Sequence, residues 1–257
     1  MTKKRILFVG CSHTADSGFT EENQLKYHWP WLLSNRYDCY FQNAGLGGMS
    51  NDEIYYRCSE IILSYKFDLV VVMWSSIGRK WVYFEENNVD EYTIINYGHI
   101  TGLNEDRSEV KKYTALHYSH FDNKFVEIKH WLIQSLSLAA TLQHQNTPFI
   151  FIKGSDNYLS DILDAACNET RFGNLSENLK TILDLDNRPD LYIIERLMSL
   201  KALADKNNQS YWFNFDKPAF FSEHYTLDLA DDGVHLGKLS NQKLDDELQD
   251  YLQDFNF

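Results

Sequence analysis

The sequence is poor in cysteine, proline, glycine and positive charge. Its 257 residues include 4 cysteines, 4 prolines and 12 glycines, and its formal net charge is −13. So few prolines and glycines argue against long disordered linkers, and 44% hydrophobic residues are typical of a globular protein with a sizeable core. The deficit of lysine and arginine disfavours nucleic acid and anionic membrane surfaces as partners.

The few cysteines and glycines do not form a cofactor motif. Cysteines occur at positions 11, 39, 58 and 167 without metal-binding spacing, so we expect reduced thiols. A metal site built from Cys11, His13 and His235 is an alternative, but these residues lack a regular ligand spacing. Neither the segment 10–13 nor the glycine-rich segment 45–48 matches the dinucleotide-binding or P-loop pattern. We therefore expect no cofactor and no metal.

Long hydrophobic runs are also missing. Met1–Arg5 is basic, like the start of a signal peptide, but only four apolar residues follow, at 6–9. That segment is too short for a signal peptide core or a membrane span. We therefore expect a soluble, cytoplasmic protein, whose oligomeric state the sequence does not specify.

What the sequence does contain is an alternation of apolar strands and amphipathic helices, which indicates an α/β fold. We expect a three-layer sandwich with a five-stranded parallel sheet of flavodoxin-like order. Residues 1–257 would form a single domain with an insertion or lid over about 82–122, where periodicity is lost. The predicted strands are 6–9, 39–43, 68–74, 148–153 and 210–214, and the predicted helices are 51–65, 125–144, 175–185, 189–207 and 241–255.

Three polar residues form a candidate catalytic set. Ser12 follows the first strand, and ligands of open α/β sheets bind at the carboxyl edge of the strands. Asp232 and His235, three residues apart, can lie side by side, so that the carboxylate holds Nδ1 and leaves Nε2 as a base. The alternative is purely structural: Ser12 caps a helix, and Asp232 caps the last helix with His235 in its first turn.

Four short sequence motifs, here called blocks, resemble those of the SGNH hydrolases, also called GDSL esterases and lipases. They occur in the same order as in that family, and the resemblance extends over nearly the full length of the chain. The blocks are Phe8–Thr14, Trp29–Leu33, Asn43–Gly48 and Asp231–His235. The resemblance implies that Ser12 is the nucleophile, His235 the general base and Asp232 its orienting carboxylate. It also implies that the backbone N–H groups of Ser12 and Gly48 donate to the oxyanion.

Two positions depart from the family pattern. Cys11 replaces the aspartate before the serine, and Ile77 replaces the asparagine whose side chain completes the oxyanion hole. Loss of one such donor typically costs about 10²- to 10³-fold in rate. The candidates to replace it are Ser75, Ser76, Asn51 and Arg79.

The expected function is serine-dependent ester hydrolysis through an acyl-enzyme, with a small-molecule or carbohydrate ester as substrate. His13 and Arg79 are candidate substrate-binding residues. Two alternatives remain: an O-acyltransferase that uses the same triad, and a binding or accessory protein weakened by the missing asparagine.

Overall fold

The computed structural model describes residues 3–15, 18–19, 22–77, 79–86, 89–96, 99–101, 108–116, 124–155, 199, 202–203, 206, 211–214 and 219–253. The chain divides into two compact units, the first made of residues 1–76, 137–156 and 210–257, the second of 77–136 and 157–209. The expectation of a single domain with a lid over about 82–122 stays a prediction. No helix in the described ranges is both long enough and apolar enough to cross a membrane.

The first unit is built on a parallel sheet in which all but one strand are buried along nearly their whole length. Its order is β2-β1-β3-β7, the first four places of the predicted flavodoxin-like order, so the α/β class is confirmed. Apolar runs with no polar alternation form such strands because helices cover both faces of a parallel sheet. The strands are β1 (Arg5–Gly10), β2 (Tyr40–Asn43), β3 (Leu69–Trp74) and β7 (Phe149–Lys153).

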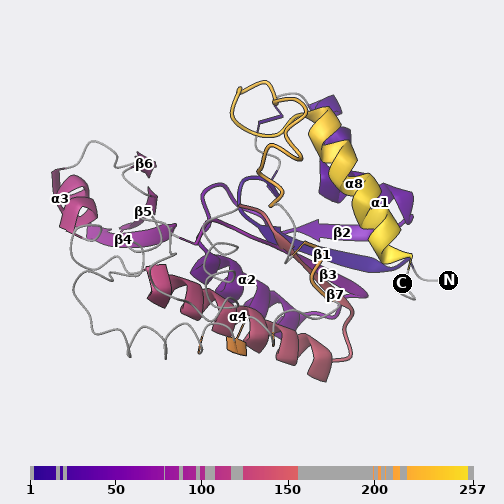
Figure 1. Ribbon diagram of the computed structural model, residues 1–257, viewed down its shortest axis with the longest axis horizontal. Helices are drawn as coiled ribbons and strands as arrows, with labels where there is room; N and C mark the ends of the chain where they lie inside the picture. The colour runs from indigo at the N-terminus through magenta and orange to yellow at the C-terminus, as the bar shows by residue number, and fades with distance from the viewer. Residues whose placement is uncertain are drawn as a thin grey trace, which may run out of the picture. The chain divides into compact units, whose positions relative to one another are not determined.

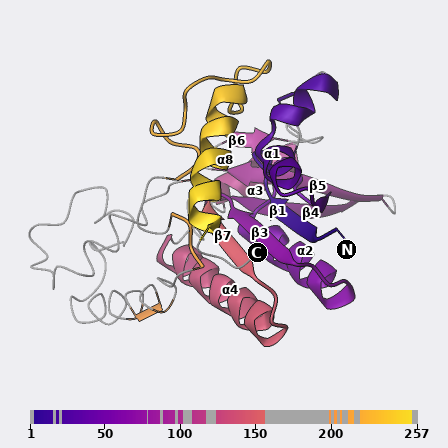
Figure 2. The same ribbon diagram turned by 90° about the vertical axis from the view of Figure 1, so that its right-hand side faces the viewer.

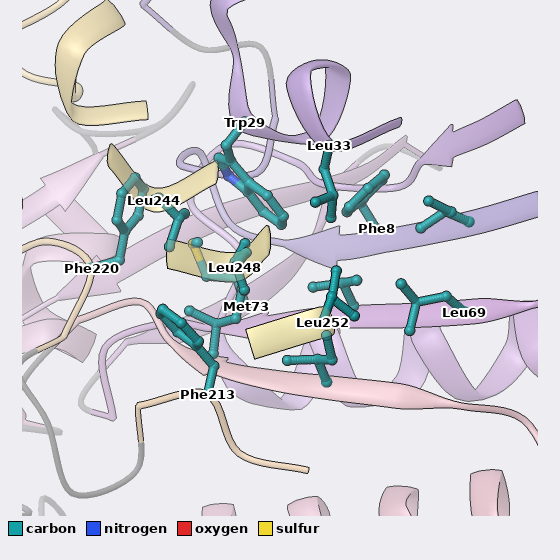
Figure 3. Close-up of a cluster of buried hydrophobic side chains, with 14 of the residues drawn as sticks. Phe8, Trp29, Leu33, Leu69, Met73, Phe213, Phe220, Leu244, Leu248 and Leu252 are labelled. Carbon is teal, nitrogen blue, oxygen red and sulfur yellow. The ribbon is translucent and has the colours of Figure 1, made fainter. Parts of the chain in front are cut away.

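Helices cover both faces of this sheet. In Figure 1, α1 (Trp29–Arg36) and α8 (Lys238–Leu252) lie on one side, and α2 (Asn51–Ser64) and α4 (Lys124–His144) on the other. A quarter turn shows the same layers (Figure 2). Alternate strand residues such as Phe8 and Met73 pack with three leucines of α8 in one buried cluster (Figure 3), completed on the α1 side by Trp29 and Leu33. The predicted three layers are therefore present.

The predicted fifth strand is not confirmed as a regular strand. Trp212 forms a single parallel bridge with Phe151 of β7. Phe151 N–H donates to Tyr211 O at 2.9 Å, and Phe213 N–H donates to Phe151 O at 2.9 Å. Beyond this bridge the side chain of Asn214 replaces the backbone, because it bonds both N–H and C=O of Lys153. The segment lies in fifth position without continuing the ladder.

Helix α8 starts three residues earlier than predicted. Its N-cap is Gly237, which has no side chain, and the cap is supplied by Asp228 from the preceding hairpin. The Asp228 carboxylate accepts hydrogen bonds from Leu239 N–H at 3.0 Å and Ser240 N–H at 2.9 Å. A sequence pattern read locally cannot show a cap supplied from nine residues upstream. The predicted helices 175–185 and 189–207 lie almost entirely outside the described residues.

The second unit contains regular structure that the sequence analysis did not predict. It has an antiparallel sheet of order β4-β5-β6 within the predicted insertion. In the sequence, Asn87 and Asn88 separate two runs rich in aromatic and β-branched residues, a pattern that is typical of a β-hairpin. The elements are β4 (Lys80–Glu86), β5 (Val89–Asn96), β6 (His99–Thr101) and α3 (Ser108–Leu116).

Candidate active site

Ser12 lies in a tight turn that leaves the carboxyl end of β1. Thr14 N–H and Ala15 N–H both donate to Cys11 O at 2.9 Å, so the chain turns immediately after the strand. Gly10 makes the turn possible, because a Cβ there would lie 2.2 Å from Thr14 Oγ1 and 2.9 Å from Met73 O. The Ser12 side chain is half-buried, as expected of a group that a ligand can reach.

Two residues at the start of α1 hold the backbone of this turn. Trp29 Nε1 donates to His13 O at 2.8 Å, and His28 Nε2 lies 3.2 Å from the same oxygen. Burial lowers the pKa of His28 to about 4, so its ring is neutral at pH 7 and donates through Nε2. The loop after β1 is therefore fixed from the helix layer, by residues to which the sequence analysis assigned no role.

The loop after β2 packs directly against the turn around Ser12, residues 11–15. Asn43 Nδ2 donates to Thr14 O at 2.7 Å, and Asn43 Oδ1 accepts from Gly45 N–H at 3.0 Å. Gly45 cannot carry a side chain, since its Cβ would lie 2.6 Å from Ala15 N. Gly48 has a φ of 77°, a left-handed conformation that favours glycine. These contacts explain the residue types of the Asn43–Gly48 block.

The loop after β3 begins beside the turn around Ser12. Gly10 of β1 pairs with Met73 of β3, so Ser12 and Ser75 each lie two residues beyond the same pair of neighbouring strand residues. Asn51 bonds the backbone of Ser75 on both sides: its Oδ1 accepts from Ser75 N–H at 2.8 Å, and its Nδ2 donates to Ser75 O at 3.2 Å. Ser75 and Ser76 are buried, and Ser75 Oγ has no hydrogen bond to any described residue.

Asp232 and His235 lie side by side and are hydrogen-bonded in the loop before α8. His235 Nδ1 lies 2.5 Å from Asp232 Oδ2, while Asp232 Oδ1 accepts from Val234 N–H at 2.9 Å and His235 N–H at 3.0 Å. Burial raises the pKa of Asp232, but the hydrogen bonds from His235 and Val234 outweigh it and lower the pKa to about 2. The structural alternative for Asp232 is wrong, because α8 begins only at Lys238 and is capped by Asp228.

A short hairpin presents this pair. Leu229 and Leu236 form an antiparallel bridge, and Ala230 N–H donates to His235 O at 2.8 Å. Asn241 fixes the base of the hairpin, because its Nδ2 donates to Leu236 O at 2.9 Å and to Gly237 O at 2.8 Å. Its Oδ1 accepts from Trp29 N–H at 3.2 Å. The buried Asn241 side chain thus connects the His235 loop to α1, the helix that holds the turn around Ser12.

The turn around Ser12 and the hairpin are in contact. The His13 ring lies edge-on to the His235 ring, with 5.3 Å between centroids, and stacks on Phe221 at 4.8 Å. Phe221 is placed there because its N–H donates to Gly154 O beyond the end of β7, at 2.7 Å. The residue that follows Ser12 is thus in contact with the ring of His235.

Two further sequence-based candidates are Arg79 and the alternative metal site. Arg79 belongs to the second unit, and its role in binding or in the oxyanion hole stays a prediction. Over the described residues, no group of three His, Cys, Asp or Glu side chains could hold a metal ion. Two residues at the site are not among the predicted ones: Gly18, whose backbone lies against Asp232 and His235, and Asn241. No local sequence signal marks either residue.

Comparison with known proteins supports the fold. The sequence matches no protein-family profile and no curated protein. Two solved structures are similar to the chain at a TM-score of 0.50. The psychrotrophic esterase EstA from Pseudoalteromonas sp. has 12% identity and covers 98% of each chain. TesA has 14% identity and covers 98% of this chain and 99% of its own. These two likenesses show that the chain shares its α/β fold with both proteins over nearly its full length.

Proposed function

We propose that this protein is a serine-dependent ester hydrolase with Ser12 as nucleophile, His235 as general base and Asp232 as its orienting carboxylate. The observation that carries the proposal is the Asp232–His235 pair. With Nδ1 occupied by the carboxylate, Nε2 is the nitrogen left to take a proton. The contact between the His235 ring and the ring of His13, the residue after the half-buried Ser12, supports this assignment.

The reaction follows from these groups. Ser12 Oγ attacks the acyl carbon while His235 Nε2 takes its proton, and the imidazolium then protonates the leaving alcohol. Asp232, ionised because its pKa is about 2, stabilises the imidazolium. Water, activated by the same nitrogen, hydrolyses the acyl-enzyme. A small acyl group on a sugar is the proposed substrate; an alcohol in place of water would make the same site an acyltransferase.

The oxyanion hole consists, in this proposal, of the backbone N–H groups of Ser12 and Gly48 and one further donor. Ser75 Oγ is our choice for that donor. It is buried beside the nucleophile turn and makes no hydrogen bond with the described residues, whereas the amide of Asn51 is used by the Ser75 backbone. A hydroxyl there replaces the family asparagine, whose position is taken by Ile77.

Hydrolysis of short p-nitrophenyl esters by Ser12→Ala tests the proposal. Ser137→Ala is the matched control, because Ser137 is exposed on α4 and its hydroxyl forms an exposed hydrogen bond of 3.1 Å with the Tyr55 hydroxyl. We expect Ser12→Ala to lose at least about 10³-fold in kcat/KM, and the control to retain its activity. A fluorophosphonate should label the wild type at Ser12.

A wild type that is neither active nor labelled would contradict the proposal. That outcome would favour the alternative of a binding or accessory protein, in which the nucleophile is not activated. Equal activity of Ser12→Ala and the wild type would place the reaction at another residue.

A further inference from the structure

The nucleophile loop touches the Asp232–His235 pair at a glycine. Gly18 has a φ of 90°, in the left-handed region where side chains are disfavoured. A Cβ at residue 18 would lie 2.9 Å from His235 Cβ, 2.9 Å from Ala230 Cβ and 3.2 Å from Asp232 Oδ2. A Cβ at this position would therefore clash with the Cβ atoms of His235 and Ala230 and would lie tightly against the Asp232 carboxylate.

The loop is anchored on both sides of the nucleophile. At its start, His13 O is held by Trp29 and His28. At its end, the ring of Phe19, the residue after Gly18, lies edge-on to the buried ring of His28, with 5.8 Å between centroids. Gly18 thus cannot move away from the hairpin without loss of the Phe19 contact.

The hairpin is equally constrained on its other side. Asn241 bonds the carbonyls that follow His235, and Ala230 is paired with His235 through the backbone. Two of the three atoms that a Cβ at residue 18 would meet are Cβ atoms fixed to this backbone, and the third is the end of the Asp232 side chain. The collision would be relieved by displacement of the pair itself.

We propose that Gly18 is a positioning residue: its bare backbone seats the nucleophile loop against the Asp232–His235 pair and sets the distance between Ser12 and His235. This inference rests on the proposed function, and it adds a residue that lies outside the four sequence blocks. A misplacement of about 1 Å in such a pair can cost about 10²-fold in rate.

The chain offers a matched control for backbone strain. Gly233 also has a positive φ, 68°, but a Cβ there would meet nothing within 4 Å. Gly233→Ala therefore measures what strain alone does, while Gly18→Ala adds the collision. We expect similar decreases in the thermal midpoint for the two variants. We expect kcat/KM of Gly18→Ala to fall about 10²-fold, at least tenfold more than that of Gly233→Ala.

Two further measurements separate positioning from general damage. The loss caused by Gly18→Ala should shrink when Asp232→Asn is already present, because both changes act on the same pair. In NMR spectra of histidine-labelled protein, the His235 ring resonances should shift in Gly18→Ala and stay close to wild type in Gly233→Ala. If Gly18→Ala does not fold, the same comparisons use Gly18→Ala combined with Ala230→Gly, which removes one of the colliding atoms.

An activity loss no greater than that of Gly233→Ala, with unmoved His235 resonances, would overturn the role of Gly18. Failure of the proposed function has a different signature, namely a wild type without esterase activity or fluorophosphonate labelling. The NMR comparison does not depend on activity, so in that case it still decides whether residue 18 positions His235.

Discussion

Asn241 offers a direct test of how the His235 loop is held. Its side chain is 2% exposed and makes three hydrogen bonds, with Trp29 N–H, Leu236 O and Gly237 O. A net contribution of about 1 kcal/mol for each bond predicts that Asn241→Ala lowers the free energy of unfolding by about 3 kcal/mol. For a chain of this size, that is a decrease of roughly 6–12 °C in the thermal midpoint.

Gln242→Ala is the matched control for this change. Gln242 is the next residue of α8, and its amide makes one exposed hydrogen bond, to Asp246. Its removal should change the free energy of unfolding by less than about 0.5 kcal/mol. Urea denaturation of both variants gives the comparison. A loss for Asn241→Ala as small as that of the control would refute the reasoning, since water would then replace the three bonds without cost.

Asn241→Asp makes the test sharper because it keeps the size of the side chain. The carboxylate can still accept from Trp29 N–H, but it would face two carbonyl oxygens where the amide donates. The folded state therefore favours the protonated acid, so its pKa is raised. Relative to the wild type at the same pH, the stability of the variant should be highest below the unfolded pKa of about 3.9 and should fall as pH rises above it. Wild-type stability at pH 7 would contradict the assigned orientation of the amide.

Three more predictions follow from other contacts. Asp232→Asn should lower kcat on p-nitrophenyl esters by up to about 10⁴-fold without unfolding the protein, because His235 loses the acceptor that orients its ring. Burial lowers the pKa of His28 to about 4, so between about pH 6.5 and pH 4 only the unfolded state binds the proton readily. We therefore expect the free energy of unfolding to fall by about 3 kcal/mol as pH decreases over this range. In urea denaturation, His28→Gln should flatten the dependence of stability on pH in this range. Arg36→Met should destabilise the protein by about 3–5 kcal/mol, because it leaves the carboxylate of Asp245, 1% exposed, without its cation; the double variant with Asp245→Leu should recover most of the loss, and no recovery would contradict the pairing.

The strands of the main sheet could be predicted because their signal is local. β1 and β3 are unbroken apolar runs, and a parallel sheet covered on both faces requires such runs. The insertion shows the opposite case: its strands β4 and β5 lie where aromatic and charged residues mix, so the apolar pattern on which the prediction relied is missing. The end of the fifth segment was also beyond prediction, because a side chain, Asn214, replaces the backbone pairing there.

The sequence by itself determined the residue types and the order of the candidate site. Ser12 follows a buried strand, and the spacing of Asp232 and His235 allows a local pair, which the structure contains. Tertiary structure alone decided what holds these residues. His28, Trp29 and Asn241 reach the site from helices, Asp228 caps α8 from the hairpin, and Gly18 is required by atoms more than two hundred residues away in the chain. Contacts of this kind depend on which surfaces the fold brings together, and no local pattern of residues encodes them.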